Sequence, residues 1–130
     1  MRYTYDLNSE KQTIVVQTRG DLFKNEVIAM GLEILLKAKE LKYKVFFDHR
    51  LSKNKISITD AYFWFSDNYD YIDTNLKLIP TAYIANQEDW EFFSFFECTS
   101  HNKGIPVKAF KEESAAWEWF NNISIPATNH

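Results

Sequence analysis

Three consecutive polar residues, Asp48, His49 and Arg50, follow the apolar run KVFF and bring a carboxylate, an imidazole and a guanidinium together. A short apolar run of this kind is typical of a strand that is buried in a parallel sheet. Ligands bind in the crevice outside the carboxyl ends of such strands, so polar residues at that end are candidates for a binding site. The alternative is structural, with Asp48 capping a helix or pairing with Arg50.

A second candidate site begins at Ser57, where the sequence reads SITD. Ser57 and Asp60 form a capping pattern that predicts the start of a helix. The free N–H groups at a helix N-terminus favour negative charge, so phosphorylation of Ser57 or Thr59, or a bound anion, would be tolerated there. The alternative is a helix cap without a further role. We group Asp60 with Asp48–Arg50 as polar crevice candidates.

Cys98 and His101 form a C-x-x-H pair, in which a thiolate and an imidazole could make a nucleophile or half of a metal site. His49 and His130 are the only other histidines, and there is no second cysteine. We therefore predict no metal site, and we expect Cys98 to be a small buried apolar residue. A single cysteine also excludes an internal disulfide and fits a reducing compartment such as the cytoplasm.

Motifs that mark common enzymes are missing from the sequence. It contains no Gly-rich phosphate loop, no G-x-S-x-G, no H-E-x-x-H and no pair of carboxylates at catalytic spacing. We therefore predict that the protein is not an enzyme, and that it has no catalytic residue and no cofactor.

Aromatic residues make up 17% of the chain, which is the main anomaly of its composition. Five of them lie between residues 90 and 96, in the stretch WEFFSFF. At 100° per residue, Phe92, Phe93 and Phe96 share one side of a helix, whereas Trp90 and Phe95 point away from it. A helix that covers a sheet buries only part of its circumference, so Trp90 and Phe95 need some other cover.

The predicted helix at residues 58–72 poses the same question. Tyr62, Phe65 and Tyr69 fall on one stripe, with Phe63 and Trp64 beside it. These rings could stack in a thick core, form a protein interface, or line a cavity for an apolar ligand. The candidates for an interface or a ligand-lining role are Phe63, Trp64, Trp90 and Phe95.

The elements that must position these residues alternate along the chain. Turn residues, apolar periodicity and capping patterns predict strands and helices in the order β-β-α-β-α-β-α-β-α. This order indicates an α/β fold with a mixed, mainly parallel sheet of about five strands and an N-terminal antiparallel hairpin. The predicted strands are 3–7, 12–18, 44–49, 78–85 and 105–110, and the predicted helices are 21–42, 58–72, 86–103 and 112–122.

The overall numbers predict one soluble domain. A chain of 130 residues fits a single domain, which we place at 1–122, followed by a polar, flexible tail at 123–130. The net charge of −3 offers no basic field, so we expect no nucleic-acid partner. We see no signal peptide and no apolar run of about 20 residues, and so expect a cytoplasmic protein without integral membrane association.

Several segments resemble the STAS superfamily, in particular the small bacterial proteins that are similar to stage II sporulation protein AA. The segments are KVFFDHR, ISITDAY, TAYIAN and GIPVKAFKEESAAWEWF. The resemblance covers nearly the whole chain and implies a STAS-like fold and a non-catalytic role in protein interaction or regulation. It also extends to lipid carriers of the Sec14 type.

The sequence departs from the regulatory members of that family at one turn. Their phosphorylated serine lies in an Asp-Ser-Ser-Gly-type turn, whereas this chain has ISITD there, with Ser57 and Thr59 as the only hydroxyls. Two hypotheses follow. The chain is an interaction module, homodimeric or bound to a regulatory protein, or it carries a small nonpolar, lipid-like molecule. The first predicts an outward apolar patch, and the second predicts an internal void.

Overall fold

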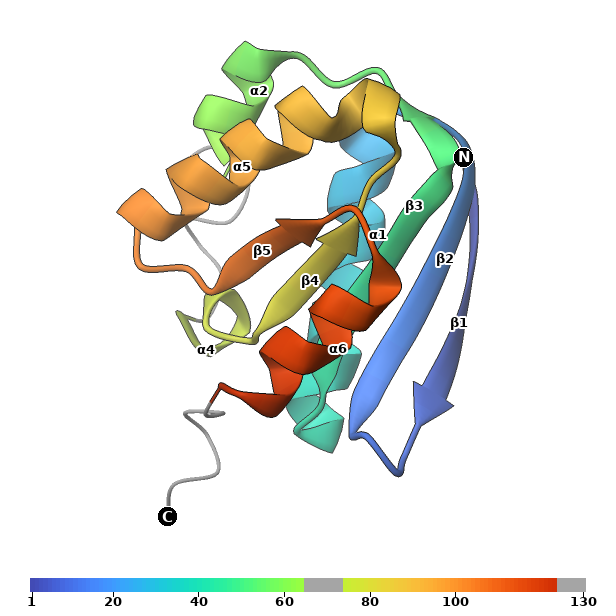
Figure 1. Ribbon diagram of the computed structural model, residues 1–130, viewed down its shortest axis with the longest axis vertical. Coiled ribbons are helices and arrows are strands. Elements are labelled where there is room, and N and C mark those ends of the chain that lie inside the picture. Colours follow the sequence, from blue (N-terminus) through green and yellow to red (C-terminus); the bar gives the residue numbers. More distant parts are fainter. Residues whose placement is uncertain (65–73, 124–130) are drawn as a thin grey trace.

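The fold is a mixed α/β sandwich built on one five-stranded sheet, as the computed structural model in Figure 1 shows. The structure describes residues 1–64 and 74–123. The predicted α/β class and the order of the main elements are confirmed, within one domain of mainly parallel strands. The strands are β1 (Arg2–Asn8), β2 (Thr13–Leu22), β3 (Lys44–Asn54), β4 (Thr81–Ile84) and β5 (Val107–Phe110); the helices are α1 (Lys24–Leu41), α2 (Ile58–Tyr62), α4 (Thr74–Lys77), the 3₁₀ helix η1 (Gln87–Asp89), α5 (Trp90–Asn102) and α6 (Glu113–Asn121).

The strands lie in the order β1-β2-β3-β4-β5. β1 and β2 form the predicted antiparallel hairpin, and each later neighbour is parallel. Parallel neighbours need crossover connections, which α1, α2 and α5 provide. Pro80 immediately precedes β4, where its missing N–H costs no ladder hydrogen bond.

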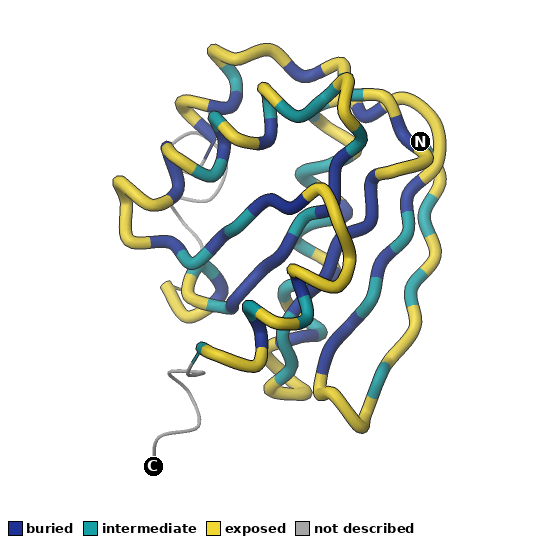
Figure 2. The backbone as a smooth tube through the Cα atoms, in the orientation of Figure 1, coloured by how far each residue is buried: buried dark blue, intermediate teal, exposed yellow. Residues whose placement is uncertain are grey.

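Helices cover both faces of the sheet. Side chains of α1, α2 and α5 pack on one face, against strand residues such as Val16, Phe47 and Val107. Of the described helices, α6 alone packs on the opposite face, where Ala116 and Phe120 meet inward-facing residues of β3, β4 and β5. Figure 2 shows the buried segments in β2, β3 and β4, the strands that lie under these helices. The sheet therefore separates two cores of different size.

Two predicted boundaries around β2 and β3 were wrong. The first helix was expected from Asp21, but Asp21 and Leu22 extend β2 and pair with Lys53 and Asn54. The strand expected at 44–49 continues to Asn54, through residues that were not predicted to lie in a strand. Backbone pairing between the ends of β2 and β3 thus replaces the loop that the polar side chains indicated.

The region of the second predicted helix is only partly described. α2 covers its first turn, and residues 65–73, which include Phe65 and Tyr69, lie outside the described residues. The short helix α4 precedes β4, in a segment for which no helix was predicted. Residues 124–130 of the predicted tail also lie outside the described part of the chain.

A side-chain cap begins the segment that leads into α5. The side chain of Asn86 accepts a hydrogen bond from the backbone N–H of Asp89 at 2.9 Å and so caps η1, which leads into α5. α5 ends before Gly104, whose φ of +73° is a conformation that glycine adopts without a steric penalty. No described helix is both long enough and apolar enough to cross a lipid bilayer.

Candidate functional site

Asp48, His49 and Arg50 lie inside β3 rather than at its carboxyl end, so their expected place in a strand-end crevice was wrong. Gln17 pairs with Asp48, and Arg19 pairs with Leu51, so one residue of β2 opposes two residues of β3. This is a β-bulge at His49 and Arg50. Bulges of this kind redirect side chains and increase the local twist.

The carboxylate of Asp48 is engaged by Arg50 on the α6 face of the sheet. The Arg50 side chain donates from Nε to Oδ1 at 3.0 Å and from Nη2 to Oδ2 at 2.8 Å, and its backbone N–H also donates to Oδ1 at 3.0 Å. The same Nη2 donates to Glu113 of α6 at 3.3 Å. The ion pair that we had considered as the structural alternative is therefore present.

Electrostatics in this group favour the charged forms. Burial raises the pKa of Asp48, but the hydrogen bonds and charge of Arg50 lower it by more, so its pKa lies below the usual value. The hydrogen bond to Asp48 in turn raises the pKa of Arg50. A carboxylate held ionised by a bidentate partner is poorly suited to accept a proton near pH 7. The arrangement ties β3 to α6.

We predict that Asp48→Asn lowers the free energy of unfolding by about 1 to 2 kcal/mol, because it removes a partly buried, charge-assisted pair whose arginine is half exposed. Glu113→Gln is the matched control, since Glu113 is 52% exposed, and its change should stay within about 0.5 kcal/mol. Urea denaturation at pH 7 measures both. Equal losses in the two variants would contradict the assignment.

His49 is buried on the other face of the sheet, among aromatic rings. Its ring stacks with those of Phe47, Tyr83 and Phe93 at centroid distances of 5.7, 5.6 and 5.3 Å. Its Nδ1 lies 2.7 Å from Oγ1 of Thr18. Burial lowers the pKa of His49 to about 4, against a smaller opposing effect of Asp48. The imidazole is therefore neutral at pH 7 and is a weak base there.

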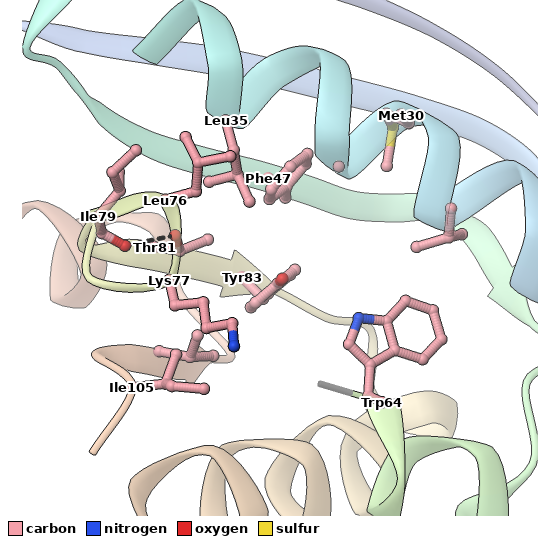
Figure 3. A pocket seen from close by; sticks show the side chains of 13 residues that line it. Met30, Leu35, Phe47, Trp64, Leu76, Lys77, Ile79, Thr81, Tyr83 and Ile105 are labelled. Carbon is pink, nitrogen blue, oxygen red and sulfur yellow. Dashed lines mark hydrogen bonds between the residues drawn. The ribbon is translucent and has the colours of Figure 1, made fainter. Parts of the chain in front are cut away.

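Two small cavities lie between the sheet and the helices on this face. One has a volume of about 50 Å³, and its lining includes Phe47, Trp64 and Tyr83 (Figure 3). The other, of about 30 Å³, is lined by His49 and Phe93 together with Trp64 and Tyr83. An apolar cavity of about 150 Å³ is needed to hold benzene, so neither cavity accommodates a lipid-sized molecule.

The residues at the start of α2 form the predicted cap on the protein surface. Oγ of Ser57 accepts a hydrogen bond from the backbone N–H of Asp60 at 3.1 Å. The Asp60 carboxylate pairs with Lys24 of α1 at 3.5 Å, and Ser57 and Thr59 are exposed. Within the two described ranges, no hydrogen bond or ion pair joins Asp60 to the residues of the β3 bulge. The polar crevice candidates do not form one site.

The four aromatic candidates divide by burial. Trp64 is only 6% exposed and packs against Phe96 of α5. Trp90 and Phe95 are half-buried within the chain, and Lys111 places its ammonium 4.9 Å from the Trp90 ring centroid. Phe63 alone is clearly exposed, at 45%. Of the four, Phe63 is the most exposed.

Two residues on α2 extend the exposed apolar surface beyond Phe63. Ile58 is 46% exposed and Tyr62 is 55% exposed, and the Tyr62 and Phe63 rings meet edge to face. We call Ile58, Tyr62 and Phe63 the α2 surface. Sequence reasoning placed Tyr62 on an aromatic stripe but did not single out Ile58, because an apolar residue just after a cap normally faces the core. Their four-residue spacing puts Ile58 and Tyr62 side by side on the helix.

The expectation about Cys98 is contradicted by its position in the structure. Cys98 is exposed on α5, so the expectation that it is buried was wrong; the buried positions next to it are Thr99 and Ser100. Among the residues with described positions, no group of three or more His, Cys, Asp and Glu side chains is arranged to hold a metal ion.

The sequence matches no protein-family model and no curated protein.

Proposed function

We propose that this chain is a non-catalytic, STAS-like interaction or regulatory module that binds a protein partner through the α2 surface. The observation that carries the proposal is the exposure of Ile58 and Tyr62 of α2 and of Phe63, which follows it, at 46, 55 and 45%. Aromatic side chains are enriched in the cores of protein interfaces, because they bury a large area at low entropic cost. The partner in this proposal is a folded protein that presents an apolar surface.

The residues around the α2 surface support a role in binding a partner through apolar contact rather than in a reaction. Ser57, at its edge, is exposed and already accepts a hydrogen bond as a cap. A phosphate on Ser57 would bring about −1.5 to −2 charges beside the carboxylate of Asp60 and next to an apolar contact area. In our proposal, modification at Ser57 or Thr59 therefore weakens partner binding, which is a regulatory effect on an interface.

The experiment compares Phe63→Ser with Leu36→Ser. Leu36 is a matched control because it is 52% exposed and lies on α1, away from α2 in sequence. Partners captured by the wild-type chain are identified, purified and titrated against each variant. We expect Phe63→Ser to weaken binding by about tenfold or more, as for a central aromatic contact, and Leu36→Ser to leave it unchanged. Equal affinities for all three chains would overturn the proposal.

A carrier of a small nonpolar molecule is the second candidate, and only the apolar lining of the internal cavities favours it. Their lining is largely apolar, and both are bounded by Trp64 and Tyr83. Their volumes of about 50 and 30 Å³ are far below the 300 to 1,000 Å³ that is typical of ligand pockets. We therefore rank carriage below interaction. A nonpolar molecule retained in native mass spectrometry would reverse this order.

A further inference from the structure

β1 forms an open edge of the sheet. One side of its backbone pairs with β2 over Arg2–Asn8, and Figure 1 shows no described element beyond its other side. The opposite edge is β5, which has only four residues, against seven in β1. An edge strand carries a row of N–H and C=O groups that can pair with another strand.

Several of the usual protections of an edge strand are missing from β1, although Arg2 and Asp6 carry charge. The segment RYTYDLN contains neither proline nor lysine, and its register with β2 runs from Arg2 to Asn8 without a bulge. Its residues alternate mainly between exposed and half-buried, as Figure 2 shows along the outer strand. Proteins that avoid edge pairing twist, shorten, charge or cover their edges. β1 is long and regular, which makes it a suitable template for another strand.

We propose that β1 pairs antiparallel with β1 of a second copy, about a two-fold axis that passes Thr4. In this register Thr4 lies opposite Thr4, Tyr3 lies opposite Tyr5, and Arg2 lies opposite Asp6. Threonine pairs, aromatic pairs and opposite-charge pairs are the cross-strand combinations that stabilise antiparallel sheets, by about 0.2 to 1 kcal/mol each. The sequence RYTYD is therefore complementary to itself when it is read in the antiparallel direction.

Other registers do not give this match. In an antiparallel pair, two facing residues are either both hydrogen-bonded or both not hydrogen-bonded, and the two kinds of position alternate along each strand. The register between two copies of β1 can therefore change only in steps that keep odd-numbered residues opposite odd-numbered ones. Centring the axis on Tyr3 or Tyr5 removes the opposite-charge pair. Centring it on Asp6 places that carboxylate opposite itself. Charge complementarity thus selects the axis at Thr4.

The charges on β1 are unbalanced within a single copy. Arg2 lies directly across from Arg19 of β2, which places like charges side by side, and Asp6 lies across from Val15. Neither Arg2 nor Asp6 has an ion pair within residues 1–64 and 74–123. A second copy in the proposed register gives Arg2 a carboxylate on its open side.

The tyrosines are held toward the α1 face before any pairing. The hydroxyl of Tyr3 donates to the carboxylate of Glu33, and the Lys37 ammonium lies 5.6 Å from the Tyr5 ring centroid. Both rings already pack beside the core cluster under α1. Pairing Tyr3 with Tyr5 of the second copy would extend that cluster across the axis without reorienting the rings.

One strand pair is a small interface. Stable dimers bury about 1,200 to 2,000 Å² in total, and a pair of seven-residue strands without helix contacts lies below that range. We therefore expect a reversible dimer whose mass in sedimentation equilibrium rises with concentration from 15.4 kDa toward twice that value. This surface differs from the α2 surface, so Phe63→Ser should leave the dimer unchanged.

Charge reversal tests the register. Arg2→Asp places two like charges at each Arg2–Asp6 pair, and so does Asp6→Arg, so each variant alone should dimerise about tenfold more weakly than the wild type. An equal mixture of the two variants restores every opposite-charge pair between unlike chains, and it should regain dimerisation. Circular dichroism checks that both variants fold. A mixture no better than either variant alone would overturn the register.

A cysteine on the axis gives a second, covalent test. In a Cys98→Ser background, Thr4→Cys should form an intermolecular disulfide on mild oxidation, because facing Cα atoms in such pairs are about 4.5 to 5.5 Å apart. Arg2→Cys is the control, because its two copies would lie about 14 Å apart in this register. A wild-type chain that stays monomeric at the highest concentration, or Arg2→Cys crosslinking as readily as Thr4→Cys, would refute the proposed pairing.

Discussion

Truncation of Trp64 to alanine is expected to lower the free energy of unfolding by about 3 to 5 kcal/mol, the usual cost of removing a buried large aromatic side chain. Trp64 is 6% exposed and packs in one cluster with Ile56, Phe96 and Val107. Its ring also borders both internal cavities, so truncation would join and enlarge voids that already exist. The surrounding helices cannot collapse freely onto that space, because α2 and α5 are fixed by other contacts.

Phe63→Ala is the matched control for Trp64→Ala, since the two residues are adjacent and of similar chemistry. Phe63 is 45% exposed, and its loss should change stability by no more than about 0.5 kcal/mol. Urea denaturation followed by far-UV circular dichroism measures both without relying on tryptophan emission. If the two variants lose similar stability, Trp64 does not occupy the buried position described above.

The contrast between these neighbours shows what the sequence could and could not predict about the aromatic residues. Helical periodicity placed Phe92, Phe93 and Phe96 on the core side. Phe93 and Phe96 are buried there, but Phe92 is only half-buried, as are Trp90 and Phe95. Periodicity could not assign burial at Trp64, because that depends on how α2 crosses α5. Packing between helices that are far apart in the sequence leaves no periodic signal in either one.

The order of elements was predictable because local signals agreed with one another. Ser57 caps α2 as expected, Asn86 caps η1, and Gly104 follows the end of α5 with a positive φ. Such signals involve residues three or four apart, so one sequence contains them in full. The same consistency explains why the α/β class was correct.

The length of β3 was not predictable, because the alternation of buried and exposed residues is reversed in the second half of the strand. Leu51 is 49% exposed, whereas Ser52 is buried with its hydroxyl 2.7 Å from that of Thr18. The bulge at His49 and Arg50 causes this change of face, and it depends on pairing with β2. A polar stretch with an outward leucine is typical of a loop, and only the partner strand makes it a strand. The candidate crevice was misplaced for the same reason.

His49 makes the stability of the fold depend on pH between its folded and unfolded pKa values. The folded pKa is about 4 and the unfolded value is about 6.5, because burial among the rings disfavours the charged imidazolium. Between these values the unfolded chain binds a proton that the folded chain does not, so the free energy of unfolding falls as the pH is lowered. Lowering the pH from 7 to 4 should cost about 3 kcal/mol from this residue.

His49→Phe isolates this effect, because phenylalanine retains a stacking ring between Phe47 and Phe93 and cannot titrate. Thr18 keeps a hydroxyl partner in Ser52, so the substitution leaves no isolated polar group on that side. The pKa of Asp48 is lowered in the folded chain, so the effect of its titration on stability falls mainly below the range from pH 7 to pH 4. The same effect is present in the wild type and in His49→Phe. Urea denaturation at intervals from pH 7 to pH 4 should give a steeper loss for the wild type than for His49→Phe. Parallel curves would mean that His49 is protonated as easily in the folded chain as in the unfolded one, which the stacked, buried ring does not allow.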